Sequence, residues 1–207
     1  MMTSTEPGPR GLLGPLLEDD DGQAAARLHA RLAADAAAEG ILDVAYRVID
    51  TPVGSLLLAA TARGLVRVAY PRQGHQAALA QLAAAISPRI LAAPARLDPV
   101  ARQLEEYFSR RRTVFDVPVD LRLASGFRRQ VLTHLPRIPY GATESYAQVA
   151  AAAGSSRAVR AAGTACAANP VPIVIPCHRV VRSDGTYGGY AGGPQAKHAL
   201  LTLEASA

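Results

Sequence analysis

Residues 169–181 read Asn-Pro-Val-Pro-Ile-Val-Ile-Pro-Cys-His-Arg-Val-Val. The apolar run from Val171 to Ile175 predicts a rigid, buried segment, and Pro176 ends it. Cys177 follows at once, with His178 as its neighbour. A thiol at the end of a buried segment is well placed to act as a nucleophile. It becomes reactive only if a base or a positive environment converts it to the thiolate.

Activation of Cys177 depends on which groups surround it. His178 could act as the base, directly or through a bridging water, and it would need a carboxylate to orient it. Glu204 is the last acidic residue of the chain and follows an apolar stretch of helical spacing, residues 195–203. Taken alone, Glu204 fits a solvated residue at the edge of a helix. Asn169 could hold a neighbouring carbonyl or could simply form a turn before proline.

Length and composition limit the class of protein. A chain of 207 residues, 49% of them hydrophobic, can form one sizeable domain or two small ones with a packed core. No run approaches the roughly 18 apolar residues of a membrane span, and no signal peptide is visible, so we expect a cytoplasmic protein. Cys166 and Cys177 are then expected to be free thiols. No Cys/His cluster is present, so no structural zinc is indicated. No cofactor is expected either.

Charge is distributed unevenly along the chain. The net charge is +5, yet residues 1–43 hold eight acidic side chains and three Arg, while the remainder holds 19 basic and nine acidic side chains. A basic body with an acidic leader favours a nucleic-acid partner, although many basic domains have no such role.

The N-terminal half divides into a leader and an α+β domain. Residues 1–43 form a leader of unknown role, flexible over 1–22 because of its Pro and Gly content and helical over 23–39. Residues 44–120 predict a small sheet with helices, an α+β unit without visible chemistry. Its expected strands are 46–49, 55–61 and 65–70, and its expected helices are 77–86 and 100–108.

The C-terminal domain, residues 121–207, is predicted to be mostly helical. A helix over 127–135 and a turn over 138–141 precede a short helix over 145–152, and Ser155 or Ser156 then caps a second helix that runs to about Ala168. Two short helices joined through a glycine favour a helix-turn-helix. The second helix is rich in Ala and Gly, which is consistent with tight packing or with close approach to DNA.

A glycine-rich segment, residues 183–193, contains Tyr190. Such a loop allows close backbone approach to a flat ligand, on which Tyr190 could stack or to which it could donate a hydrogen bond. The segment lacks the spacing of a phosphate-binding loop.

These motifs together resemble the active-site signature of the O6-alkylguanine-DNA alkyltransferases, also called methylated-DNA–protein-cysteine methyltransferases. The resemblance is carried by Pro176-Cys177-His178-Arg179-Val180 after Asn169-Pro170, and it covers roughly residues 44–204. It also includes the turn 138–141, the glycine-rich 188–193, and the stretch from Lys197 to Glu204. Several motifs in family order make it specific.

The resemblance implies DNA repair by direct damage reversal, in which an alkyl group moves irreversibly from O6-alkylguanine in duplex DNA to Cys177. By similarity, His178 is the base that works through a water. Glu204 orients and polarises His178, and Asn169 positions the strand and turn near the thiolate. Whether alkylated thymine is also a substrate is left open.

The resemblance also implies how the lesion is reached, because a stacked base must be flipped out before it can react. Tyr146 would promote rotation of the backbone and offer its hydroxyl to the leaving guanine, and Arg160 would fill the vacated stack. Ala161 and Gly163 would allow the second helix to enter the minor groove. Tyr190, Ala191, Val180 and Pro172 would line the pocket. A monomer in solution is expected, and whether it binds DNA cooperatively is left open.

Two departures from the family pattern stand out. Leu132 occupies a position where members commonly have tryptophan, and Ala191 replaces a serine found in some members. We expect changed packing at the first and a changed substrate range at the second. Alternative functions are a non-catalytic protein that binds alkylated DNA lesions, which the intact Cys177 argues against, a Cys-His hydrolase, and a transcriptional regulator.

Overall fold

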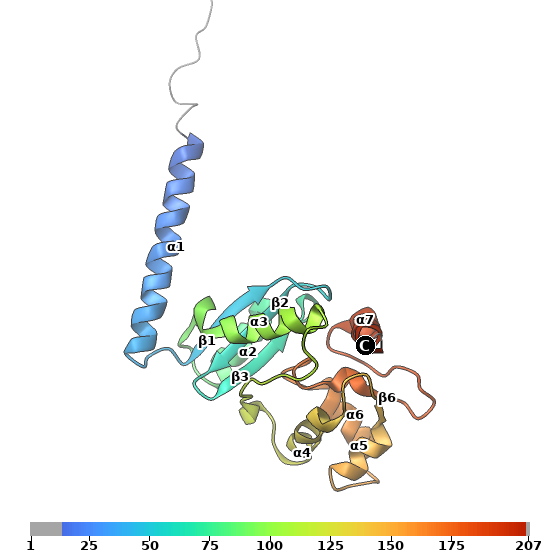
Figure 1. Cartoon of the computed structure of the whole chain (residues 1–207). Coiled ribbons are helices and arrows are strands. Elements are labelled where there is room, and N and C mark those ends of the chain that lie inside the picture. The colour runs from blue at the N-terminus through green and yellow to red at the C-terminus, as the bar shows by residue number, and fades with distance from the viewer. Residues whose placement is uncertain (1–13, 206–207) are drawn as a thin grey trace, which may run out of the picture. The chain divides into compact units, whose positions relative to one another are not determined.

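The computed structural model describes residues 14–205 of the chain, which divides into two compact units with the boundary between Leu42 and Asp43. In the first unit, α1 spans Gly14–Ala38 (Figure 1). The helix therefore begins well before the predicted start at residue 23. The prediction of a flexible segment was wrong for residues 14–22. Pro15 is tolerated there because the first N–H groups of a helix have no acceptor within it. The prediction for residues 1–13 lies outside the described residues.

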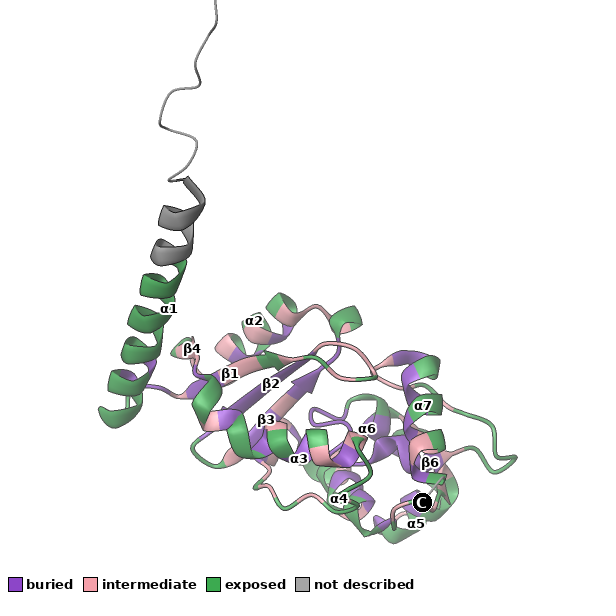
Figure 2. Ribbon diagram, turned by 45° about the horizontal axis from the view of Figure 1, so that its top comes forward, coloured by how far each residue is buried: buried purple, intermediate pink, exposed green. Residues whose placement is uncertain are grey.

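A four-stranded sheet forms the N-terminal part of the second unit. Its strands are β1 (Val44–Ile49), β2 (Leu56–Thr61), β3 (Gly64–Ala69) and β4 (Ile90–Ala92), in the order β3-β2-β1-β4. The β1–β2 and β2–β3 pairs are antiparallel, and β1 and β4 are parallel. The three predicted strands are present, whereas β4, with three residues, was missed. Every residue of β2 is buried, as Figure 2 shows for the centre of the sheet.

Helices cover both faces of this sheet, because side chains of a strand alternate between faces. Ala59 packs with Leu82 of α2 (His75–Ala85) on one face, whereas Leu56 and Leu58 lie in the same core cluster as Leu104 of α3 (Asp98–Phe108) on the other. Short 3-10 turns, η2 (Pro71–Gln73) and η3 (Pro94–Leu97), precede the two helices.

The C-terminal part is mostly helical, and the predicted α+β fold is confirmed. Its helices are α4 (Gly126–His134), α5 (Tyr146–Ala152), α6 (Val159–Ala167) and α7 (Gly193–Ala205). Three 3-10 turns, η4 (Leu121–Leu123), η5 (Leu135–Arg137) and η6 (Cys177–Arg179), and two short parallel strands, β5 (Glu144–Ser145) and β6 (Val180–Val181), complete it. Its core is continuous with the α3 face of the sheet, and Leu132 is fully buried within it.

The predicted helix-turn-helix corresponds to α5 and α6, which pack against each other and against α4 (Figure 1). Ser145 caps α5: its hydroxyl accepts a hydrogen bond from the Gln148 N–H at 3.2 Å. The expected cap of the second helix at Ser155 or Ser156 was wrong. Residues 155–158 form a turn closed by the Ala158 N–H and the Ser155 carbonyl, so that α6 begins at Val159.

Candidate active site

The segment that leads to Cys177 is a compact, buried turn rather than a strand. Ile173 adopts φ 76°, an uncommon conformation for a β-branched residue, so the surrounding contacts must hold the backbone there. Asn169 supplies several of them. Its Oδ1 accepts from the Val171 N–H at 3.0 Å, and its Nδ2 donates to the Ile175 carbonyl at 2.8 Å. The predicted role of Asn169 in holding a neighbouring carbonyl therefore fits the observed contacts.

The same Asn169 amide also reaches the thiol. Its Nδ2 lies 3.1 Å from Sγ of Cys177, which is 2% exposed. Burial raises the pKa of Cys177 to about 11, although the Asn169 hydrogen bond and the charge of Lys197 act in the opposite direction. At neutral pH the thiol is thus protonated in the free protein, and it needs a base to act as a nucleophile.

Lys197 of α7 is fully buried near this thiol. Its Nζ donates to the Val180 carbonyl at 2.5 Å. Burial lowers the pKa of Lys197, and negative charge on Cys177 or Cys166 raises it. The positive charge of Lys197 therefore favours the thiolate form of Cys177.

His178 lies in the fully buried turn η6 and contacts Glu204 of α7. Its Nε2 is 2.8 Å from Oε1 of Glu204. An ionised carboxylate can only accept, so Nε2 carries the proton and Nδ1 is the basic nitrogen of the neutral ring. Burial lowers the pKa of His178, which keeps the ring neutral near pH 7. Nδ1 is buried and has no hydrogen-bond partner among the described residues, so it remains available to accept a proton.

Glu204 accepts hydrogen bonds from four residues, and His178 is one of them. The donors are the Tyr107 hydroxyl at 2.6 Å, His178 Nε2 at 2.8 Å, Arg179 Nε at 2.8 Å and Nη2 at 3.0 Å, and the Gly141 N–H at 3.2 Å. Burial favours the neutral acid, but the bonds from His178 and Arg179 outweigh it and lower the pKa of Glu204 to about 2. Glu204 is thus a buried carboxylate, not the solvated residue that its position alone suggested.

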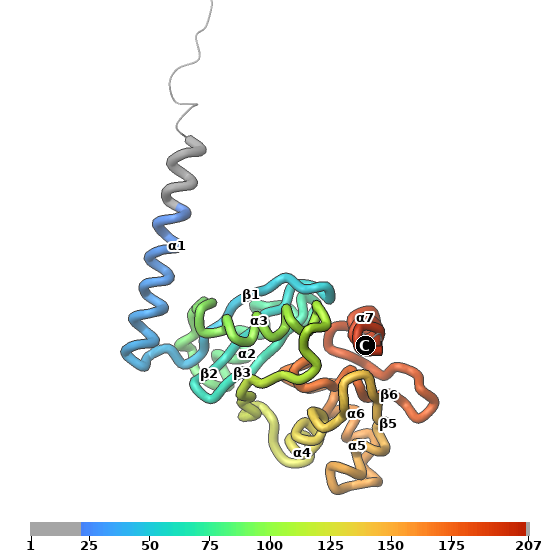
Figure 3. The backbone as a smooth tube through the Cα atoms, in the orientation of Figure 1, coloured from blue at the N-terminus to red at the C-terminus, as the bar shows by residue number. Residues whose placement is uncertain are grey.

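Tyr107 and Arg179 were not predicted as site residues. Tyr107 belongs to α3 of the sheet domain, so its hydrogen bond to Glu204 links α3 to α7, both of which are traced in Figure 3. Arg179 also donates from Nη1 to the Ile138 carbonyl at 2.6 Å, and its guanidinium carbon lies 5.7 Å from the centre of the Tyr140 ring. The turn 138–141 quoted from the sequence therefore holds this ion pair.

Tyr146, the first residue of α5, lies beneath the glycine-rich loop. A Cβ at Gly188 would lie 2.1 Å from its hydroxyl, so the loop backbone rests directly on the phenol. Burial raises the pKa of Tyr146, as do the neighbouring Cys166 and Cys177, and the phenol stays protonated.

The residues of α6 that are predicted to contact DNA differ in their exposure to solvent. Arg160 and Ala161 are exposed on α6, with Thr164 one turn further along. Gly163 is half-buried, and a Cβ there would face the Tyr146 ring at 3.9 Å. Its small size brings α6 close to Tyr146, and its predicted place at the DNA groove stays a prediction.

The predicted pocket residues come from both sides of Cys177. Pro172 and Val180 are buried, while Tyr190 and Ala191 are half-buried in the loop after β6. The Tyr190 ring stands edge-on to His178, with 6.3 Å between ring centres. Cys166 is also buried. Burial, and to a lesser extent negative charge on Cys177, raise the pKa of Cys166 to about 12.

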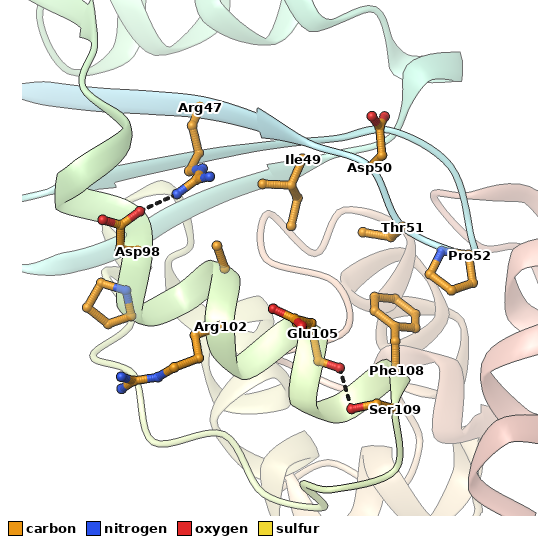
Figure 4. Close-up of a pocket in the computed structure, with 12 residues that line it drawn as sticks. Arg47, Ile49, Asp50, Thr51, Pro52, Asp98, Arg102, Glu105, Phe108 and Ser109 are labelled. Carbon is orange, nitrogen blue, oxygen red and sulfur yellow. Dashed lines mark hydrogen bonds and ion pairs between the residues drawn. The ribbon is translucent and has the colours of Figure 1, made fainter. Parts of the chain in front are cut away.

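A separate pocket of about 810 Å³ lies between β1 and α3 (Figure 4). Arg47 and Asp98 form an ion pair at its edge, and Asp50, Glu105 and Phe108 also line it. Its lining contains no cysteine, histidine or tyrosine, so it shares no residue with the site around Cys177. Within residues 14–205, no helix has the length and apolar character of a membrane span.

Two family models match the second unit. The ribonuclease-like domain of 6-O-methylguanine DNA methyltransferase matches residues 44–121, and the DNA binding domain of the same family matches residues 126–206. The methylated-DNA--protein-cysteine methyltransferase of Mycolicibacterium paratuberculosis is 38% identical over 161 residues, which are 78% of this chain and 92% of the relative. The mouse protein of the same name is 39% identical over 170 residues, a match that covers 77% of this chain and 80% of the relative.

Solved structures of methyltransferases have the same fold as this chain. The O6-methylguanine methyltransferase of Mycobacterium tuberculosis superposes with a TM-score of 0.70 at 37% identity, covering 79% of this chain and 93% of that one. The structure of the Mycobacterium tuberculosis protein in complex with DNA superposes with a TM-score of 0.69 at 37% identity. This match covers 78% of this chain and 93% of that one. With both family models matched and these relatives nearly covered, the chain belongs to the 6-O-methylguanine DNA methyltransferase family.

Proposed function

We propose that this protein repairs DNA by transferring the alkyl group of O6-alkylguanine to Cys177. The observation that carries the proposal is the buried thiol in contact with the Asn169 amide and followed by a His178–Glu204 pair. It is supported by membership of a family whose relatives are named methylated-DNA--protein-cysteine methyltransferases.

The reaction is a displacement at the alkyl carbon. Nδ1 of His178 takes the thiol proton through a water, the Sγ–carbon bond of Cys177 forms, and the bond from that carbon to O6 breaks. The Tyr146 phenol donates its proton to the leaving guanine and is reprotonated by the proton that the thiol gave up to His178, so that in total one proton moves from Cys177 to guanine. Glu204 stabilises the charged imidazole. No step restores the thiol, so each protein molecule acts once.

DNA is the expected partner of the exposed face of α6. Arg160 and Ala161 share this face, and α6 has small side chains that permit close approach in a minor groove. We infer that Arg160 fills the gap left by the flipped base, because an exposed, long cationic side chain can occupy the stack and pair with phosphates. Arg160→Ala is expected to slow transfer from duplex DNA while leaving transfer from the free modified base unchanged.

The test is stoichiometric alkylation. The protein is incubated with duplex DNA containing one O6-methylguanine and then analysed by intact mass and peptide mapping. We expect one methyl group on Cys177 and none after Cys177→Ala. Cys166→Ala, which removes the other buried thiol, is the matched control and should transfer normally.

Other outcomes identify the alternatives. Binding of the lesion without an adduct would support a non-catalytic lesion-binding protein, and release of product in excess of protein would support a hydrolase. Either result, or a methyl group on Cys166, would overturn the proposal.

A further inference from the structure

Tyr70 is a buried residue of the sheet domain that meets the loop carrying Tyr190. It follows β3 directly and is 1% exposed. Its hydroxyl oxygen lies 3.0 Å from that of Tyr190, and either group can be the donor. The two rings also pack edge to face, with 5.7 Å between their centres.

The backbone of the loop rests on the same ring. A Cβ at Gly192 would lie 2.6 Å from Cε1 of Tyr70, so only glycine fits there without displacement. Next to it, a Cβ at Gly193 would lie 2.6 Å from Nη1 of Arg72 in η2. Tyr70, which follows β3, therefore packs against the loop at the point where it enters α7.

The tyrosine pair belongs to the surroundings of the thiol. Burial raises the pKa of Tyr70 most, and negative charge on Cys177 raises it further; both effects also act on Tyr190. On its other side Tyr190 stands edge-on to His178. Tyr190 is thus held between the catalytic histidine and Tyr70.

The position of the Tyr190 side chain depends on its hydrogen bond to Tyr70. Among the described residues, Tyr190 is the hydrogen-bond partner of the Tyr70 hydroxyl. Two hydroxyls share one mutual bond, which uses one proton and fixes the direction of both groups. Without the Tyr70 hydroxyl, the Tyr190 side chain loses the polar contact that fixes its rotamer.

We propose that Tyr70 is a positioning residue for alkyl transfer. Acting through Tyr190, it holds the loop 190–192 as a fixed wall beside Cys177, and this wall limits the size of the O6 substituent that the site accepts. The inference rests on the proposed function, because it requires the alkyl carbon to be attacked at Cys177.

Tyr70→Phe tests the inference, since it keeps the ring and removes only the hydroxyl. Single-turnover rates are measured with two duplexes, one containing O6-methylguanine and one containing O6-benzylguanine. We expect the ratio of the benzyl rate to the methyl rate to rise about threefold to tenfold, as loss of one hydrogen bond allows. Tyr46→Phe, at a half-buried tyrosine of β1 outside this contact, should leave the ratio unchanged.

The rate ratio separates positioning from general destabilisation, because a loss of folded protein lowers both rates and leaves their ratio constant. A double-mutant cycle then tests whether Tyr70 acts through Tyr190. Tyr190→Phe removes the same hydrogen bond, so the double variant should show the ratio of the single variants rather than their product. An unchanged or lowered ratio in Tyr70→Phe, or multiplicative effects, would overturn the role of Tyr70. If the wild-type protein places no alkyl group on Cys177, the proposed function itself fails.

Discussion

Replacing Glu204 by glutamine should destabilise the fold as well as slow the chemistry. A glutamine keeps the volume but offers one acceptor oxygen and an NH2 group to a site where Tyr107, His178, Arg179 and Gly141 all donate. The Arg179 side chain, 6% exposed, would remain buried without its counter-charge.

The magnitude follows from two independent considerations. Breaking a buried ion pair by removing one partner costs about 3–5 kcal/mol. A Glu204 pKa lowered from 4.5 to about 2 corresponds to about 3 kcal/mol of stability at neutral pH. For a domain of this size the melting temperature should fall by roughly 6–20 °C.

Calorimetry or urea unfolding of Glu204→Gln measures this loss, and Glu144→Gln is the matched control. Glu144 also contacts a histidine, His134, at 2.8 Å, but its side chain is 26% exposed. The control should lose less than about 1 kcal/mol. If Glu204→Gln were no less stable than the control, the role assigned to Glu204 would be refuted.

The acid dependence supplies a second readout of the same variant. The folded-state pKa of Glu204 lies below the unfolded value, so its contribution is complete above about pH 4.5 and is lost as the pH falls toward 2. The difference in unfolding free energy between wild type and Glu204→Gln should therefore shrink over that range.

Two further variants probe the thiol and the loop. Lys197→Met removes a buried cation that lowers the pKa of Cys177, so the midpoint of the pH dependence of alkyl transfer should move to higher pH; an unchanged midpoint would contradict this electrostatic role. Gly188→Ala places a methyl group against the Tyr146 hydroxyl and should slow single-turnover transfer by roughly tenfold to a hundredfold. Gly189→Ala, where a Cβ meets nothing within 4 Å, should react normally, and equal rates for the two variants would rule out the contact.

Much of the fold could be predicted from local pattern. Strands β1 to β3 and helices α2, α3, α4, α5 and α7 have clear periodicity, and the structure has them near the predicted positions. The strands β4 and β5 have three and two residues, too few for any periodicity, and they form because a neighbouring strand offers partners. The start of α1 was missed because Pro and Gly suggested a flexible segment.

The site was predictable where its residues lie together in the sequence. Cys177 and His178 stand in one motif, and the resemblance added Glu204 and Asn169. Tyr107 could not be predicted, because it lies 97 residues from Glu204 and looks like any buried aromatic of an amphipathic helix. Tyr70 likewise meets Tyr190 across 120 residues of chain. Arg179 stood in the quoted motif, and a charged residue directly after a buried segment, with Glu204 as the last acidic residue of the chain, was the signal that could have found it.

The five hydrogen bonds to Glu204 also bear on how this protein can change over generations. A substitution there removes the orienting carboxylate of His178 and, at the same time, the anchor between α3 and α7. In a cell such a variant would be lost largely through reduced abundance, before its rate of reaction mattered. A viable substitution at position 204 is therefore expected to require a simultaneous change at Arg179.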